Sequence, residues 1–165
     1  MFFEYRVALF GHRDLLSYRK IEERLHTVLD DLFRATEYVN FHIGRNGDFD
    51  IISASVIKQH RKAIGNENCV LTLVLPYMQS NIEDYEKYYD DVIIPDSLTK
   101  IYPKRAITER NKWIVENCDM LICFVEKKSG GAYNALKYAE KLGKRIINLA
   151  DDAYFDNDLL PTFIF

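Results

Sequence analysis

The sequence has few cysteines, only three of its 165 residues, which limits both disulfide bonds and cysteine-ligated metal sites. Cys69, Cys118 and Cys123 are odd in number and lie in or beside apolar runs, which is typical of reduced core thiols. No CxxC motif occurs, and no histidine and cysteine stand at ligand spacing, so we expect no structural zinc site. This pattern predicts a cytoplasmic protein without a bound metal.

Long apolar runs are absent as well. No stretch approaches the roughly 20 residues that span a bilayer, and residues 1–6 lack the basic region and apolar run of a signal peptide. A net charge of −3 gives no general reason to bind nucleic acid or an anionic membrane. The sequence therefore disfavours membrane and nucleic-acid partners.

The usual fingerprints of nucleotide-binding enzymes and hydrolases are also missing. The sequence has no GxxxxGK[ST], which disfavours a P-loop NTPase, and no GxGxxG after the first predicted strand, which disfavours a standard dinucleotide enzyme. GxSxG is absent, and no Ser/His/Asp set stands at a recognisable spacing.

What the chain does contain is a regular alternation of apolar runs and amphipathic stretches. Strands are predicted at 7–10, 38–43, 69–75, 92–94, 120–125 and 145–149. Helices are predicted after Ser17 and at 50–63, 81–91, 106–117 and 131–142, with 96–104 as a loop. This order predicts an α/β fold, a Rossmann-like three-layer sandwich with a mainly parallel sheet and helices on both faces.

We expect residues 1–165 to form a single domain, with a core over about 5–150 and a tail over 151–165. The tail is acidic and then apolar, so it is expected to pack on the core or on a second subunit.

Glycines gather where predicted strands pass into helices. Five of the seven lie at such junctions, namely Gly11, Gly44, Gly47, Gly130 and Gly131. In a parallel sheet these junctions share the carboxyl edge, where open α/β sheets bind ligands. Glycine lets a ligand approach the main chain, and the amides of a helix N-terminus attract anions. The pattern predicts a cradle for phosphate or a similar group, although each glycine alone is equally compatible with a tight turn.

Basic residues lie near the same predicted edge. Arg13 and Arg45 fall in the first two junctions, and residues 100–112 hold five basic residues, including Arg105 and Arg110, against the single acid Glu109. An arginine fork matches phosphate geometry. Taken one by one, such residues are more often solvated surface charges.

Three motifs in this order resemble the SLOG superfamily, the Rossmann-like group of DprA/Smf and the LOG "lysine decarboxylase-like" proteins. They are Gly11-His12-Arg13 after a strand, Gly44-x-x-Gly47-x-x-Asp50 opening a helix, and Ser129-Gly130-Gly131-Ala132 after a strand. Within that group the chain resembles small single-domain members with a GHR motif, related to YpsA. The likeness extends over residues 7–149.

The resemblance implies a nucleotide-type ligand, NAD- or ADP-ribose-like, on the glycine-rich edge. LOG enzymes cleave the N-glycosidic bond of nucleoside monophosphates with an arginine and a glutamate. Arg110 matches the arginine, but Leu136 and Lys137 stand where the acidic pair would be, so the catalytic glutamate is unmatched. The resemblance favours a sensor or regulatory binding module. An N-glycosidase is the alternative and DprA-like DNA binding is less favoured, while a homodimer is expected because LOG-type relatives pair through helices.

Several side chains have two open interpretations. Asp50 either caps its helix or binds a ribose hydroxyl, and His12 either holds its loop or donates to the ligand. With Arg110, Asp50 and Glu126 are the candidate catalytic groups. The predicted ligand-binding set is Gly11, His12, Arg13, Gly44, Arg45, Gly47, Asp50, Arg105, Arg110, Ser129, Gly130, Gly131 and Asn134.

Overall fold

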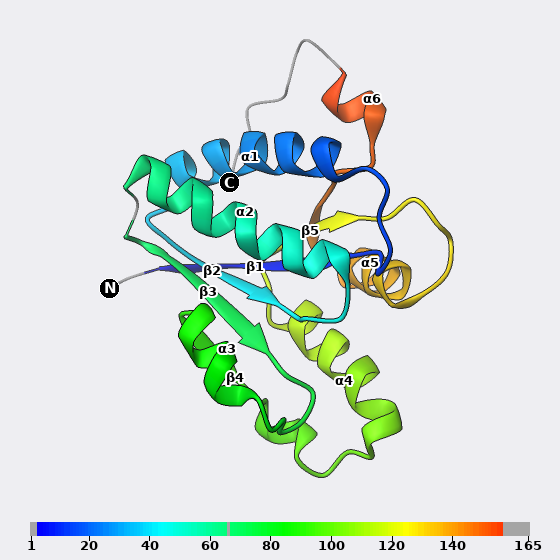
Figure 1. Cartoon of the computed structure of the whole chain (residues 1–165). Helices are drawn as coiled ribbons and strands as arrows, with labels where there is room; N and C mark the ends of the chain where they lie inside the picture. The colour runs from blue at the N-terminus through cyan, green and yellow to red at the C-terminus, as the bar shows by residue number, and fades with distance from the viewer. Residues whose placement is uncertain (1–2, 66, 157–165) are drawn as a thin grey trace.

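A computed structural model describes residues 3–65 and 67–156 and contains one six-stranded parallel sheet (Figure 1). The strands are β1 (Glu4–Gly11), β2 (Tyr38–Ile43), β3 (Cys69–Val74), β4 (Asp91–Ile93), β5 (Met120–Phe124) and β6 (Arg145–Asn148). The helices are α1 (Tyr18–Ala35), α2 (Asp48–Ile64), α3 (Ile82–Tyr88), the 3-10 turn η1 (Asp96–Leu98), α4 (Pro103–Glu116), α5 (Gly131–Lys141) and α6 (Asp152–Phe155). The predicted α/β class, parallel sheet and strand–helix alternation are confirmed.

Side chains that alternate between the two faces of the central strands form two hydrophobic cores, one on each face of the sheet. In β1, Val7 and Leu9 belong to the cluster that includes the buried residues of α1 and α2. Ala8 and Phe10 belong to the cluster that includes residues of α4 and α5. Successive side chains of a strand point to opposite faces, so both faces of β1 need a helical cover. Figure 1 shows α1 and α2 on one face of the sheet, with α4 and α5 on the other.

Strand order places a topological switch point between β1 and β5. The order is β4-β3-β2-β1-β5-β6, and β1 pairs in parallel with β2 on one side and β5 on the other. The chain therefore leaves β1 and β5 toward opposite parts of the sheet. At such a point the loops after the two strands diverge and leave a crevice at the carboxyl edge.

Two helix starts differ from the predictions. α2 begins at Asp48 with Gly47 at its N-cap, so Asp50 lies in the first turn and is not the cap residue. α4 begins at Pro103, inside the predicted loop, because proline fits the first turn of a helix, where its missing N–H is not needed. Ser17 does occupy the N-cap of α1, but its side chain makes no capping hydrogen bond.

The start of the tail packs on the core. Tyr154 and Phe155 contact the cluster beneath α1 and α2, and the guanidinium carbon of Arg24 lies 4.8 Å from the Phe155 ring centre. Residues 157–165, which include the rest of the apolar tail, lie outside the described part. No helix among the described residues is long and apolar enough to cross a bilayer.

Candidate functional site

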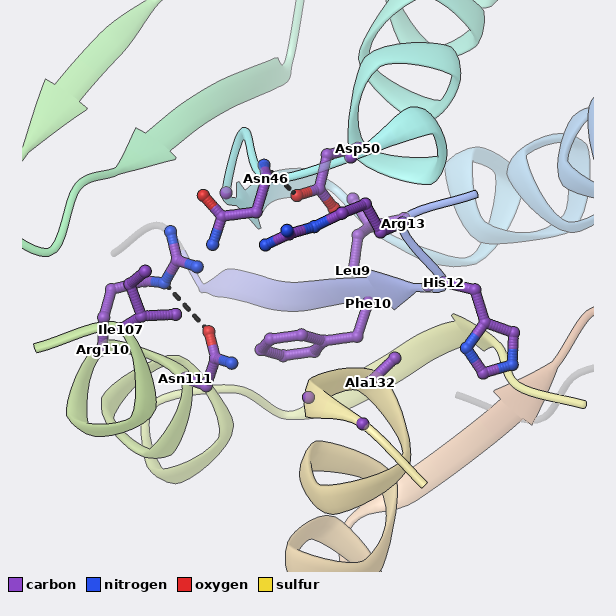
Figure 2. Close-up of a pocket in the computed structure, with 15 residues that line it drawn as sticks. Leu9, Phe10, His12, Arg13, Asn46, Asp50, Ile107, Arg110, Asn111 and Ala132 are labelled. Carbon is purple, nitrogen blue, oxygen red and sulfur yellow. Dashed lines mark hydrogen bonds between the residues drawn. The ribbon is translucent and has the colours of Figure 1, made fainter. Parts of the chain in front are cut away.

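A cavity of about 330 Å³ lies at the switch point, beyond the carboxyl ends of β1 and β5. Four segments enclose it: the end of β1 with its loop, the loop from β2 into α2, one face of α4, and the start of α5 (Figure 2). The lining residues are Leu9, Phe10, Gly11, His12, Arg13, Gly44, Asn46, Gly47, Asp50, Ile107, Arg110, Asn111, Gly130, Gly131 and Ala132. All five junction glycines therefore converge on one space.

Arg110 is the buried charge of this cavity. The residue is only 3% exposed. Nη1 donates to the carbonyl oxygen of Val74 at 3.1 Å, and Nε donates to Oδ1 of Asn111 at 2.9 Å. Across residues 3–65 and 67–156, no carboxylate forms an ion pair with the guanidinium and no acceptor bonds Nη2. Burial lowers the pKa of Arg110, and the charge of Asp50 opposes that shift.

The N-terminus of α5 supplies hydrogen-bond donors to the same space. Gly130 takes φ 94°, a left-handed conformation that favours glycine, and the helix has neither a side-chain cap nor an acidic residue in its first turn. Because the first amides of a helix have no intrahelical acceptor, those of Gly131 and Ala132 remain available beside the cavity that both residues line. Helix dipole and free amides together suit an anion.

The N-terminus of α2 differs, because it carries negative charge of its own. Asp48 and Asp50 lie in its first turn, although neither forms a side-chain capping hydrogen bond. Oδ2 of Asp48 accepts from the Leu15 amide at 3.2 Å and from the Tyr18 hydroxyl at 3.1 Å. Oδ2 of Asp50 accepts from the Asn46 amide at 2.9 Å. Among the described residues, α5 is therefore the helix that presents to this cavity an N-terminus without acids in its first turn.

Asp50 is the one carboxylate that lines the cavity among the described residues. Burial raises its pKa, opposed by the Asn46 amide and by the charge of Arg110. A desolvated carboxylate at this position can accept a ligand hydroxyl or stabilise developing positive charge.

Three of the glycines have packing reasons that the sequence did not reveal. A Cβ on Gly44 would lie 2.6 Å from Nη1 of Arg110, and one on Gly47 would lie 2.5 Å from Cα of Arg13. A Cβ on Gly11 would overlap the ring of Phe49. These three glycines let Phe49 of α2, Arg110 of α4 and Arg13 of the loop after β1 pack directly against the backbone. This close packing sets the shape of the cavity that the glycines line.

His12 holds a loop in place. Its Nε2 accepts the backbone amides of Glu126 at 2.8 Å and of Lys127 at 3.1 Å, so this nitrogen carries no proton. Burial and the charge of Lys127 lower the pKa of His12, which agrees with a neutral ring. The imidazole ties the loop after β1 to the loop after β5 across the switch point.

Five predicted site residues lie outside this cavity. Arg45 donates to the Tyr89 hydroxyl at 3.1 Å. Arg105 is exposed, and its Nη2 lies 3.5 Å from Oε1 of Glu109. Glu126 and Ser129 are exposed in the loop after β5, and Asn134 lines a smaller neighbouring cavity.

The structure adds lining residues that the sequence reasoning missed, among them Phe10, Asn46, Ile107 and Asn111. Adjacency could have indicated two of them. Asn46 lies inside the Gly44-x-x-Gly47 turn, and Asn111 follows Arg110. Phe10 and Ile107 carry no polar signal and resemble ordinary core residues in the sequence.

The sequence matches no protein-family model and no curated protein. Two solved structures are similar in fold. DNA processing protein A (DprA) from Streptococcus pneumoniae gives a TM-score of 0.61 at 14% identity, over 86% of this chain and 49% of that chain. DNA processing protein A from Helicobacter pylori, described for its single-stranded DNA binding mode, gives a TM-score of 0.58 at 15% identity. That match covers 86% of this chain and 63% of the Helicobacter pylori chain.

These neighbours show that the chain has the Rossmann-like fold of DprA. The chain spans about half to two thirds of their length. The closer relation to YpsA stays a prediction.

Proposed function

We propose that this protein binds the phosphate of a nucleotide or nucleotide-derived ligand in the switch-point cavity, and acts as a sensor or regulatory binding module. Arg110 and the first amides of α5 would hold the phosphate. The ligand class includes nucleoside monophosphates, ADP-ribose and NAD-like dinucleotides.

The observation that carries the proposal is the buried guanidinium of Arg110, which forms no direct ion pair with a carboxylate among the described residues. A buried charge without an ion-pair partner is costly, and a bound anion offsets that cost. Charge-assisted hydrogen bonds to phosphate are among the stronger polar contacts. Both the arginine and the N-terminus of α5 border the same cavity.

The test is titration calorimetry with adenosine 5′-monophosphate, ADP-ribose and NAD on wild type, Arg110→Gln and Arg105→Gln. Arg105 is a matched control because it lies on the same helix, exposed and outside the cavity. Losing charge-assisted bonds should weaken binding by about ten- to a hundredfold in Arg110→Gln, with little change in Arg105→Gln. If both variants bind as wild type does, or if no phosphate compound binds wild type, the proposal is wrong.

A second candidate, an N-glycosidase, is favoured by one observation: the Asp50 carboxylate shares the cavity with Arg110. In that reaction water adds to the sugar carbon while the base departs, so that a nucleoside monophosphate yields free base and ribose 5-phosphate. Asp50 would stabilise the positively charged, oxocarbenium-like transition state. Chromatography of the incubated compounds distinguishes the two functions, because a binding module releases no free base.

DNA binding is a third function to test, because the DprA of Helicobacter pylori is described for its single-stranded DNA binding. The chain's net charge of −3 disfavours this function here. We expect a fluorescent single-stranded oligonucleotide to show no anisotropy change at physiological salt.

A further inference from the structure

A second, smaller cavity adjoins the first. It encloses about 110 Å³ between α4 and α5. Its lining residues are Thr108, Asn111, Lys112, Val115, Gly131, Asn134, Ala135 and Tyr138. Asn111 and Gly131 also line the switch-point cavity, so these two residues lie between the two spaces.

The second cavity has a mixed but mainly apolar character. Val115 and Ala135 are buried in it, and the hydroxyl of Tyr138 already donates to Oε1 of Glu116 at 2.7 Å. Thr108, Asn111 and Asn134 supply a few uncharged polar groups. Apolar walls with a few polar groups are typical of sites for small ring systems. A volume of about 110 Å³ holds roughly four waters, which suits a ring system and is too small for a whole nucleotide.

Asn111 connects this space to the phosphate-binding arginine. Its Oδ1 accepts from Nε of Arg110 at 2.9 Å. Its Nδ2 lies 3.6 Å from the position that a Cβ on Gly131 would take. That distance is ordinary van der Waals contact, so Asn111 and Gly131 together form the boundary between the two cavities.

We propose that the cavity between α4 and α5 receives the heterocyclic base of the ligand whose phosphate binds at Arg110. This inference rests on the proposed function and specifies its ligand: a base-bearing nucleotide is selected over a sugar phosphate. The sugar would lie over Asn111 and the exposed Gly131, from one cavity to the other. Asn111 is a positioning residue for Arg110 and also faces the base.

The test compares the affinities for adenosine 5′-monophosphate and ribose 5-phosphate. Wild type should prefer the nucleotide by about tenfold or more, because burying an apolar ring is worth that much. Thr108→Phe fills the second cavity from an exposed position of α4 that does not line the first. It should reduce the ratio of the two affinities toward one while leaving the ribose 5-phosphate constant unchanged.

Two further variants complete the design. Asn134→Leu fills the same cavity from α5, also at an exposed position, and covers the case in which Thr108→Phe does not fold. Lys104→Phe is the matched control, exposed on α4 and outside both cavities, and should preserve the wild-type ratio.

Equal wild-type affinities for the two compounds, or an unchanged ratio in both filling variants, would overturn this inference. The proposed function fails differently, through binding of both compounds that is absent or insensitive to Arg110→Gln. The two failures are therefore distinguishable in one set of titrations.

Discussion

The guanidinium of Arg110 lies directly against the backbone of Gly44, where a Cβ atom would come within 2.6 Å of Nη1. The glycine after β2 thus makes room for an arginine from α4, although α2, β3, α3, β4 and η1 lie between them in the chain. This contact places a buried positive charge at the edge of the sheet, where it lines the switch-point cavity.

Gly44→Ala should displace Arg110 and destabilise the protein by about 1–3 kcal/mol, the usual cost of overpacking. A double-mutant cycle with Arg110→Ala, measured by chemical denaturation, checks the cause. The cost of Gly44→Ala should shrink when Arg110 is already truncated, since coupled residues are non-additive. Strict additivity would mean that the alanine methyl clashes with something else.

Asp50→Asn should strengthen the binding of phosphate compounds by several-fold, because it removes a negative charge from the cavity and retains an oxygen acceptor for the Asn46 amide. In wild type, anion affinity should rise as pH falls through the raised pKa of Asp50. Asp50→Asn should lack this pH-dependent rise in anion affinity. Titrations at several pH values measure both effects, and weaker phosphate binding by Asp50→Asn would contradict the assigned electrostatics.

Protonation of His12 should lower the free energy of unfolding in mild acid. Its folded-state pKa lies below the ordinary value of 6.5, so the unfolded chain takes up a proton first. The stability contribution is complete above pH 6.5 and is lost as the pH falls from there through the folded-state pKa. His12→Gln does not titrate, so the difference in unfolding free energy between wild type and variant should narrow over that range. A constant difference from pH 8 to pH 5 would show that the imidazole is not the neutral acceptor described.

His42 should remain neutral to a much lower pH. It is 3% exposed and stacks on Trp113, with ring centres 5.7 Å apart. Burial, with a smaller contribution from the charge of Arg6, lowers its pKa to about 4. Its neutral form stabilises the fold above pH 6.5, and roughly 3 kcal/mol of that is lost as the pH falls from 6.5 toward 4. An NMR titration of the imidazole checks this, and a midpoint near 6.5 would contradict the burial.

The sequence predicted the sheet well, because burial leaves a direct mark on composition. Strands β1 and β5 are buried on both faces and appear as the apolar runs Val7–Phe10 and Met120–Val125. The junction glycines could also be placed, since parallel strands bring their carboxyl ends to one edge.

Which basic residues face the cavity could not be predicted in the same way. Arg105 and Arg110 share α4 and differ by five positions, yet Arg110 is buried and donates to the carbonyl oxygen of Val74, whereas Arg105 is exposed beside Glu109. Arg45 adjoins Gly44 in the sequence, yet its side chain turns to Tyr89. Side-chain direction in a loop depends on neighbours that the local sequence does not contain.

The most direct test is the crystal structure of the protein soaked with adenosine 5′-monophosphate. We predict phosphate density between the Arg110 guanidinium and the amides of Gly131 and Ala132, with the base between α4 and α5. An empty cavity at a ligand concentration that saturates the protein in solution, or a phosphate bound away from Arg110, would contradict the account.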